Sequence, residues 1–275
     1  MGAIEHLAIE TLGADDARAG LALSEEAHWN QNEADWRFFL TRGTVFGIRD
    51  GDTRLIATAA LLPYTSSNAW ISMVLVTQSW RRRGLATKLL DACLEAAAKR
   101  GLTTWLDATP AGATVYGPLG FTPTLELRRL RLAASAARTA PKLASDSNLD
   151  EMIARDRRAM GFDRSALLRE LGGRRGAQLN SQGSAMALIR DGRTARHIGP
   201  LFAYDMGSAT ALIETIAQSE TRPILADVVN EHVEFIKNLT DSGWTIERPF
   251  QRMRFGRAAT QNAAPPFAVA GPEYG

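Results

Sequence analysis

The chain carries the same order of predicted elements twice. In residues 4–132 and again in 149–256, apolar strands alternate with amphipathic helices in one succession. Both halves close on a strand, a helix, a glycine–aromatic step and a last strand, so YGPLGF in the first half lines up with LTDSGW in the second. The repeat predicts a tandem duplication of one α/β unit, each unit a mixed, mostly antiparallel sheet flanked by helices.

The composition shift between the halves predicts where the domains end. Residues 133–147 are rich in Ala and Ser and hold one Pro, which is typical of a linker. We therefore expect a first domain over 1–134, a linker over 135–147, a second domain over 148–257 and a tail over 258–275. The tail is rich in Ala, Pro and Gly, which favours an irregular segment. Its FAVAG stretch is apolar enough to dock on the body instead.

Charge and cysteine content exclude some classes of protein. The 275 residues carry a formal net charge of +2, too little to indicate a nucleic-acid binder. The single cysteine, Cys93, allows no internal disulfide and no cysteine-based metal site, and the four histidines lie in no metal-ligand spacing. The sequence shows no signal peptide and no apolar run near the roughly 20 residues of a membrane span. We expect a cytoplasmic protein without a metal or a membrane partner.

A basic stretch, SWRRRGLATKLL, joins a buried strand to a helix. The strand is the apolar run 69–76, of the kind buried on both faces. After Gly84, apolar residues recur at one stripe of a helix: Ala86, Leu89, Leu90, Cys93, Leu94 and Ala97. Further on, residues 125–132 alternate like a strand, with one slip at Arg128–Arg129 that predicts a β-bulge.

Three interpretations of Arg81–Arg83 compete. A solvated helix start is the usual fate of a short charge run, but cations there oppose the helix dipole. A nucleic-acid patch would use Trp80 as well, although no known motif supports it. The third interpretation is a phosphate cradle, in which the first-turn N–H groups and the arginines surround an anion and Gly84 lets the backbone come close.

The stretch Arg81-Arg82-Arg83-Gly84-Leu85-Ala86 resembles the Gln/Arg-x-x-Gly-x-Gly/Ala loop of the GNAT superfamily of N-acetyltransferases. The segment VYGPLGF is similar to that family's Tyr-x-x-x-Gly-Phe segment. The resemblance covers residues 4–132, and over 150–256 it rests on element order alone. It implies tandem GNAT folds, with acetyl-CoA as the cosubstrate and strands 69–76 and 103–109 splaying apart around it.

The resemblance also implies which residues bind acetyl-CoA. The strand Met73–Val76 would run beside the pantetheine arm, and the loop up to Thr87 would hold the pyrophosphate. The implied binding residues are Leu75, Val76, Arg81, Arg82, Arg83, Gly84, Leu85, Ala86 and Thr87.

The resemblance further implies a catalytic role for Tyr116, which stands before Gly120-Phe121 as the family's tyrosine does. A phenol there can protonate the departing thiolate as a general acid, although packing within its helix is the alternative. On the acceptor side, acidic and aromatic residues in 23–40 suit a cationic amine, and a plain solvated helix face suits the same pattern. The expected substrate-binding residues are Glu25, Glu26, Trp29 and Asp107.

The second half departs from the first at the same positions. Tyr204 and Asp205 stand where the first half has Arg81 and Arg82, and Leu239 stands where it has Tyr116. An acidic residue in the loop would repel phosphate, so we expect the second domain not to bind acetyl-CoA productively. It would instead wall the acceptor cleft or form the interface of a homodimer.

The function that these residues predict is transfer of an acetyl group from acetyl-CoA to a primary amine, in our interpretation that of a small molecule. A protein N-terminus or lysine as the acceptor is one alternative. A non-catalytic acyl-CoA-binding regulatory module is another, which Tyr116 disfavours.

Overall fold

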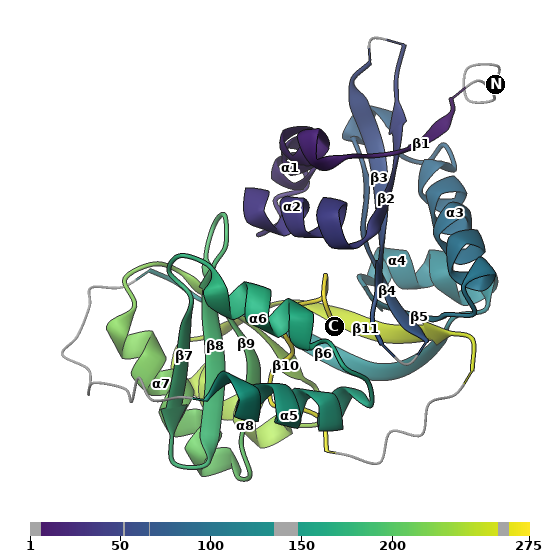
Figure 1. Cartoon of the computed structure of the whole chain (residues 1–275). Coiled ribbons are helices and arrows are strands. Elements are labelled where there is room, and N and C mark those ends of the chain that lie inside the picture. Colours follow the sequence, from purple (N-terminus) through teal and green to yellow (C-terminus); the bar gives the residue numbers. More distant parts are fainter. Residues whose placement is uncertain (1–6, 52, 66, 135–147, 258–263) are drawn as a thin grey trace. The chain divides into compact units, whose positions relative to one another are not determined.

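A computed structural model of the chain describes residues 7–51, 53–65, 67–134, 148–257 and 264–275 (Figure 1). Their contacts divide the chain into two compact units. The first unit takes in residues 1–106 and 254–256, and the second takes in 107–253 and 257–275.

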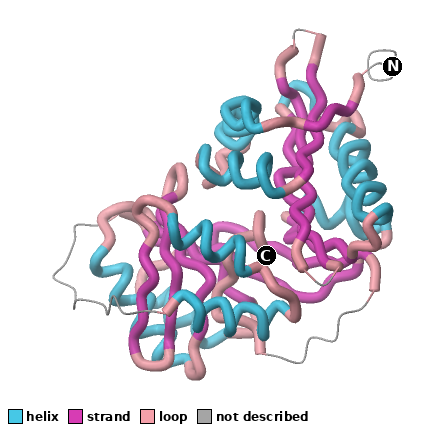
Figure 2. Tube along the Cα trace, viewed as in Figure 1, coloured by secondary structure: helices cyan, strands magenta, loops and turns pink. Residues whose placement is uncertain are grey.

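The first unit is a sheet with helices on both faces (Figures 1 and 2). Its strands run in the order β1-β2-β3-β4-β5; neighbours are antiparallel from β1 to β4, and β4 and β5 are parallel. Helices α1 and α2 lie on one face and α3 on the other. The elements are β1 (Ile9–Thr11), η1 (Ala14–Asp16), α1 (Ala17–Glu26), α2 (Glu33–Arg42), β2 (Thr44–Arg49), β3 (Leu55–Pro63), β4 (Asn68–Val76), η2 (Gln78–Trp80), α3 (Leu85–Lys99) and β5 (Thr103–Ala108), whose last two residues belong to the second unit.

Apolar patterning explains these elements. Strands β3 and β4 are buried along almost their whole length, as their continuous apolar runs predict. Helix α3 buries Leu89, Leu90, Cys93 and Ala97 of the predicted stripe against the sheet, whereas Ala86 and Leu94 are only half-buried. Burial raises the pKa of the Cys93 thiol to about 12. The thiol therefore stays protonated at neutral pH, which fits a structural role for this residue.

The second unit repeats this plan. Its strand order is β11-β6-β10-β9-β8-β7, with β7, β8 and β9 antiparallel, β9 and β10 parallel, and β10 and β6 antiparallel. The elements are α4 (Pro110–Tyr116), η3 (Gly117–Leu119), β6 (Thr122–Leu132), α5 (Leu149–Met160), α6 (Ser165–Gly173), β7 (Gln178–Gln182), β8 (Ala185–Asp191), β9 (Arg196–Phe202), α7 (Met206–Ser219), β10 (Ile224–Val229), α8 (Val233–Asp241) and β11 (Thr245–Phe255). The run β7-β8-β9-β10 thus has the order and directions of β2-β3-β4-β5, and the predicted fold class is confirmed.

A bulge recurs at the same place in both sheets. The β3–β4 register shifts between Thr58 and Ala60, and the β8–β9 register shifts between Ala187 and Ile189. Each bulge lies shortly before the loop that leads from its strand into the next long helix, from β4 into α3 and from β9 into α7. A bulge kept in both copies is what a duplicated unit would retain, because bulges re-aim the strand that follows them.

The contact-based units do not follow the predicted domain limits at residues 134 and 148. The second half of strand β6, from Leu127 to Leu132, pairs with β10, so β6 belongs to the second unit although it precedes the predicted linker. The linker itself, residues 135–147, lies outside the described residues. The predicted limits concern where one repeat ends in the sequence, and as such they stay a prediction.

The predicted bulge at Arg128–Arg129 is wrong. The β6–β10 register runs without a shift through Val228↔Arg128 and Asp227↔Arg129. Arg129 is buried because its guanidinium donates two hydrogen bonds of 2.8 Å to the Asp227 carboxylate, which is fully buried too. A polar residue inside a strand pattern here marks an ion pair in the core.

The predicted tail divides into two parts. Residues 258–263 lie outside the described residues, whereas 267–271 are all buried in the second unit. Phe267 and Ala268 join its main apolar cluster, and Val269 packs with Val229 and Phe250. The docked alternative, rather than an irregular tail, therefore holds for FAVAG.

Candidate functional site

The parallel strands β4 and β5 stop pairing before β4 ends, and this separation is here called the splay of the first unit. The parallel β4–β5 register comprises Asn68↔Thr103, Ala69↔Thr104 and Trp70↔Trp105, and ends there. Three residues further on, Met73 has a φ of 52°, and its carbonyl oxygen accepts a 2.8 Å hydrogen bond from the Thr58 hydroxyl. The bulge at Met73 turns the last residues of β4 away from the regular ladder, so a ligand can lie along their backbone.

The loop from Thr77 to Gly84 carries the chain from β4 into α3. Arg82 and Gly84 both have positive φ, 60° and 78°, and Gly84 is the N-cap of α3. A Cβ added at Gly84 would meet no atom within 4 Å, so its role is conformational and the space beside it is open. The first-turn N–H groups of α3, at Leu85 to Thr87, point out of the helix start, where an anion is favoured.

The three arginines lie on the outside of this loop. Arg81 donates from Nε to the Val76 carbonyl oxygen at 3.0 Å, and Arg83 donates from Nη2 to that of Ser79 at 3.1 Å. Arg83 also lies 4.7 Å above the Trp80 ring. All three residues are exposed, so their positive charges surround the start of helix α3 at the surface of the protein.

Glu26 anchors the loop to α1. Its carboxylate accepts hydrogen bonds from the Thr77 hydroxyl, at 2.6 and 2.9 Å to the two oxygens, and from the Gln78 backbone N–H. These hydrogen bonds, first that of Thr77 and then that of Gln78, lower the pKa of Glu26. Glu26, predicted to bind the acceptor, thus holds the start of the loop between β4 and α3.

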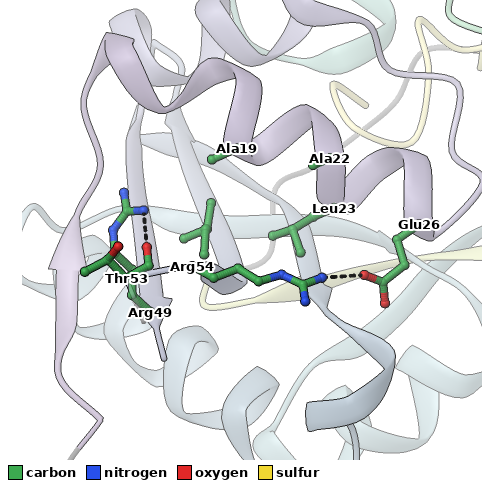
Figure 3. A pocket seen from close by; sticks show the side chains of 8 residues that line it. Ala19, Ala22, Leu23, Glu26, Arg49, Thr53 and Arg54 are labelled. Carbon is green, nitrogen blue, oxygen red and sulfur yellow. Dashed lines mark hydrogen bonds and ion pairs between the residues drawn. The ribbon is translucent and has the colours of Figure 1, made fainter. Parts of the chain in front are cut away.

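A pocket of about 230 Å³ lies on the α1 side of Glu26 (Figure 3). Arg54 reaches across it toward Glu26, with 3.7 Å between guanidinium and carboxylate, and Arg49 donates to the Thr53 carbonyl oxygen at 3.0 Å. The lining residues are Ala19, Ala22, Leu23, Glu26, Arg49, Thr53, Arg54 and Leu55. Both guanidinium groups have carboxylate partners, because Arg49 also pairs with Glu10 and Asp16.

The other predicted acceptor residues lie in two places. Glu25 is exposed at the end of α1, and Trp29 follows in the α1–α2 connection with its N–H bonded to the Ser24 carbonyl oxygen. Asp107 is buried in the second unit, where Arg252 donates to its two oxygens at 2.8 and 2.9 Å. Burial raises the pKa of Asp107, and the Arg252 charge opposes that rise. An amine would have to displace Arg252 to reach this carboxylate.

Tyr116 is the last residue of α4, in the second unit. It is half-buried, and its ring lies 5.9 Å from that of Phe121, which follows Gly120. The Tyr-x-x-x-Gly-Phe segment therefore folds as a short helix and a turn that bring its two aromatic rings together.

The second unit has a different connection at the matching place. Only Ala203 to Asp205 separate β9 from α7, and Asp205 caps α7 by accepting a 2.8 Å hydrogen bond from the Ser208 N–H. The hydrogen bonds from Ser208, and then that from the Ser184 hydroxyl, lower the pKa of Asp205. Leu239, matching Tyr116 in the repeat, is fully buried in α8. The protein's own carboxylate thus occupies this helix start.

Sequence reasoning missed three contributors to the site: Thr77, Thr58 and Arg54. A lone threonine or arginine carries no signal, because its role depends on which residue the fold places opposite. The bulge at Met73 was equally invisible, since methionine is unusual at positive φ.

Comparison with protein families decides the assignment. The profile described as "Acetyltransferase (GNAT) family" matches residues 9–121, and the one described as "Acetyltransferase (GNAT) domain" matches 152–266. The chain belongs to the GNAT superfamily. It is a two-domain member, and the family makes it an acyltransferase, with acetyl-CoA as the family's usual cosubstrate. A search of curated protein sequences gave no match.

Solved structures share the fold of this GNAT protein. A candidate acetyltransferase from Pyrococcus horikoshii has a TM-score of 0.78 and 20% identity, over 99% of this chain and 97% of the other. A GCN5-related N-acetyltransferase from Sphaerobacter thermophilus has 0.66 and 14%, over 90% and 95%. A tandem GNAT protein of the clavulanic acid biosynthesis pathway has 0.64 and 17%, over 92% and 100%. At these identities the likeness concerns the fold alone.

Two further features, a metal site and a membrane-spanning helix, are absent from the described ranges. No three His, Cys, Asp or Glu side chains gather there as a metal site. Among the helices of that part of the chain, none has the length and apolar character needed to cross a membrane.

Proposed function

We propose that this GNAT protein transfers the acetyl group of acetyl-CoA to a primary amine of a small molecule, and that the cosubstrate binds in the first unit. The observation that carries the proposal is the sequence of features along the backbone there. A bulged strand leaves its sheet partner, and a loop with two positive-φ residues then opens onto a helix start rimmed by three arginines.

Acetyl-CoA matches these features in chemistry. Its pyrophosphate is a dianion that the first-turn N–H groups of Leu85 to Thr87 and the side chains of Arg81 to Arg83 can bind. Its pantetheine arm carries amides that can pair with the backbone of Leu75 and Val76. Open space beside Gly84 supports this fit, because a phosphate needs close approach to the backbone there.

The proposed reaction is direct transfer. The amine nitrogen bonds to the thioester carbonyl carbon, the C–S bond breaks, and the products are an amide and CoA thiol. Tyr116 would give the thiolate its proton, a role supported by its place in the Tyr-x-x-x-Gly-Phe segment. The amine proton would pass to a carboxylate such as Glu25, directly or through water, because Glu26 is held by Thr77 and Gln78.

A thiol-release assay tests the proposal. The protein is mixed with acetyl-CoA and a panel of small amines, with lysine peptides and peptides bearing a free N-terminus as further arms. The expected result is acceptor-dependent thiol release that Arg82→Asp strongly lowers at acetyl-CoA concentrations that nearly saturate the original protein. Arg18→Asp, which makes the same charge change on the exposed start of α1, is the control and should change nothing.

Each arm of the assay has a distinct meaning. Turnover with peptides but not with small amines would reassign the acceptor to a protein. Acetyl-CoA binding without thiol release from any acceptor would leave a non-catalytic acyl-CoA-binding module, and would overturn the proposed transferase.

A further inference from the structure

The second unit has a splay of its own, in the place that the repeat assigns to a cofactor. Parallel pairing of β9 and β10 comprises Ile224↔Arg196, Leu225↔His197 and Ala226↔Ile198, and ends there. The bulge at Gly199–Pro200 follows at once, as the bulge at Met73 follows the end of the β4–β5 pairing. By its topology this splay corresponds to the one in the first unit where we propose that acetyl-CoA binds.

A segment of the same chain lies in this cleft. Residues 267–275, here named the insert segment, bridge the two strands, with Ala268 facing both Leu201 of β9 and Val228 of β10. On the β9 side, the Leu201 N–H donates to the Ala268 carbonyl oxygen and the Phe267 N–H to that of Leu201, both at 2.9 Å. The insert segment therefore satisfies backbone groups that the splay leaves without a strand partner.

The β10 side is bridged in the same way. The Val229 N–H donates to the Phe267 carbonyl oxygen and the Val269 N–H to that of Asp227, both at 3.0 Å. Gly199 permits this close approach, since a Cβ there would overlap the Val269 carbonyl oxygen. An extended chain between two splayed strands has the hydrogen-bonding pattern that the amides of a pantetheine arm would need.

Beyond the cleft, the insert segment contacts two buried arginines, of which Arg164 lies in the α5–α6 connection. Arg190 of β8 donates to the Glu273 carboxylate at 3.0 Å, and Arg164 donates to the carbonyl oxygens of Tyr274 and Gly275. Asp156 fixes Arg164 with hydrogen bonds of 2.7 and 2.8 Å. In the repeat, α5 and α6 correspond to α1 and α2, the pair that lines the acceptor side in the first unit.

We infer that the insert segment is a built-in occupant of both halves of the second unit's cleft, donor and acceptor, and that this unit takes no acyl-CoA. Residues 267–270 fill the donor half, and Glu273 and Tyr274 fill the acceptor half. The capped helix start at Asp205 is an independent obstacle to a phosphate at the same cleft. The chain then has one acyl-CoA site, in the first unit, and that count rests on the proposed function.

The test is hydrogen exchange on the full chain with a substitution that expels the occupant. Ala268 has no exposed surface, so Ala268→Arg cannot keep the insert segment between the strands. Ala264→Arg places the same side chain at an exposed position four residues earlier and is the matched control. We expect Ala268→Arg to raise the exchange of the Leu201 and Val229 amides at least tenfold, and Ala264→Arg to leave both slow.

Two outcomes of this exchange experiment would overturn the inference. Slow exchange of the Leu201 and Val229 amides in Ala268→Arg would show that other groups protect them. Loss of protection along the whole β6–β10 ladder would show that the segment is an integral core strand and no displaceable occupant. Loss confined to β9, the end of β10 and the insert segment supports it.

A titration of the unaltered protein with acetyl-CoA separates this inference from the proposed function. One molecule bound per chain, with the Leu201 and Val229 amides unchanged, is expected. Two molecules per chain, or faster exchange of those amides at saturation, would overturn the occupant. Absence of any binding would contradict the proposed function, while the exchange pattern of the variants would still decide the occupant by itself.

Discussion

The two units share one backbone arrangement but carry opposite charges at the matching helix start. In each, the pairing of two parallel strands ends, a bulge follows in one of them, and that strand leads into a helix. The first unit meets the helix start with Arg81 to Arg83, and the second meets it with the carboxylate of Asp205. The difference teaches that one backbone arrangement can carry opposite charge at its helix start, and that in the second unit a segment of the chain itself lies between the separated strands.

The largest expected effect concerns Tyr116, for which the second unit has Leu239. Tyr116→Phe removes the proposed general acid and keeps the ring, so kcat should fall about 10²- to 10⁴-fold while KM for acetyl-CoA stays near its original value. Steady-state kinetics with the best amine of the panel measures both. A kcat within a factor of three of the original would assign Tyr116 to packing against Phe121.

The sequence pattern does not predict the buried ion pair between Arg129 of β6 and Asp227 of β10. Burial alone would raise the pKa of Asp227, but the charge of Arg129 and the His197 ring, 3.1 Å from the carboxylate, more than offset this and lower it. Asp227→Asn leaves Arg129 charged and unpaired in the core, so the free energy of unfolding should drop by about 3–5 kcal/mol.

Urea denaturation measures that change, with Asp241→Asn as the control. Asp241 pairs with Lys237 on the surface, where water screens the ion pair and its loss should change stability little. A loss no larger than the control's would mean that the buried pair does not stabilise the second unit.

Reversal of charge in the loop sharpens the contrast directly. Arg82→Asp gives the first unit the residue type of the second, and should weaken acetyl-CoA binding about 100-fold by removing a charge-assisted contact and adding repulsion. Calorimetric titration measures the dissociation constant. The reverse change, Asp205→Arg, should create no second site, because the insert segment still fills the cleft; a second site would break the comparison.

The smallest expected effect is at Glu26. Glu26→Gln keeps the shape and removes the charge that Thr77 and Gln78 stabilise, so acetyl-CoA binding should weaken about five-fold. Because hydrogen bonding lowers the pKa of Glu26 in the folded protein, its anchoring is complete above the ordinary value of 4.5 and is lost as pH falls through the lower, folded value.

Titration of acetyl-CoA affinity against pH tests the anchor. The original protein should lose affinity on acidification more steeply than Glu26→Gln, which has no carboxylate to protonate at this position. Parallel curves for the two proteins would assign the acid loss of affinity to other groups.

Much of the fold and part of the site follow from local sequence. Features that depend only on neighbouring residues can be predicted from the pattern. They are the apolar runs of β3 and β4, the apolar stripe of α3 and the glycine at its N-cap, Gly84. Partnerships between distant residues do not follow in this way. Nothing near Arg129 names Asp227 as its partner, nothing near Asp107 names Arg252, and β6 has no local feature that selects β10 as its neighbour.

The splay in the first unit has a consequence for how long the protein survives in a cell. Strand edges without partners are templates for aggregation, and the second unit covers its own with the insert segment. In the first unit, that cover would have to come from bound acetyl-CoA, which stabilises the folded state in proportion to the logarithm of its concentration. The abundance of this protein would then follow the metabolic supply of acetyl-CoA, independently of any turnover.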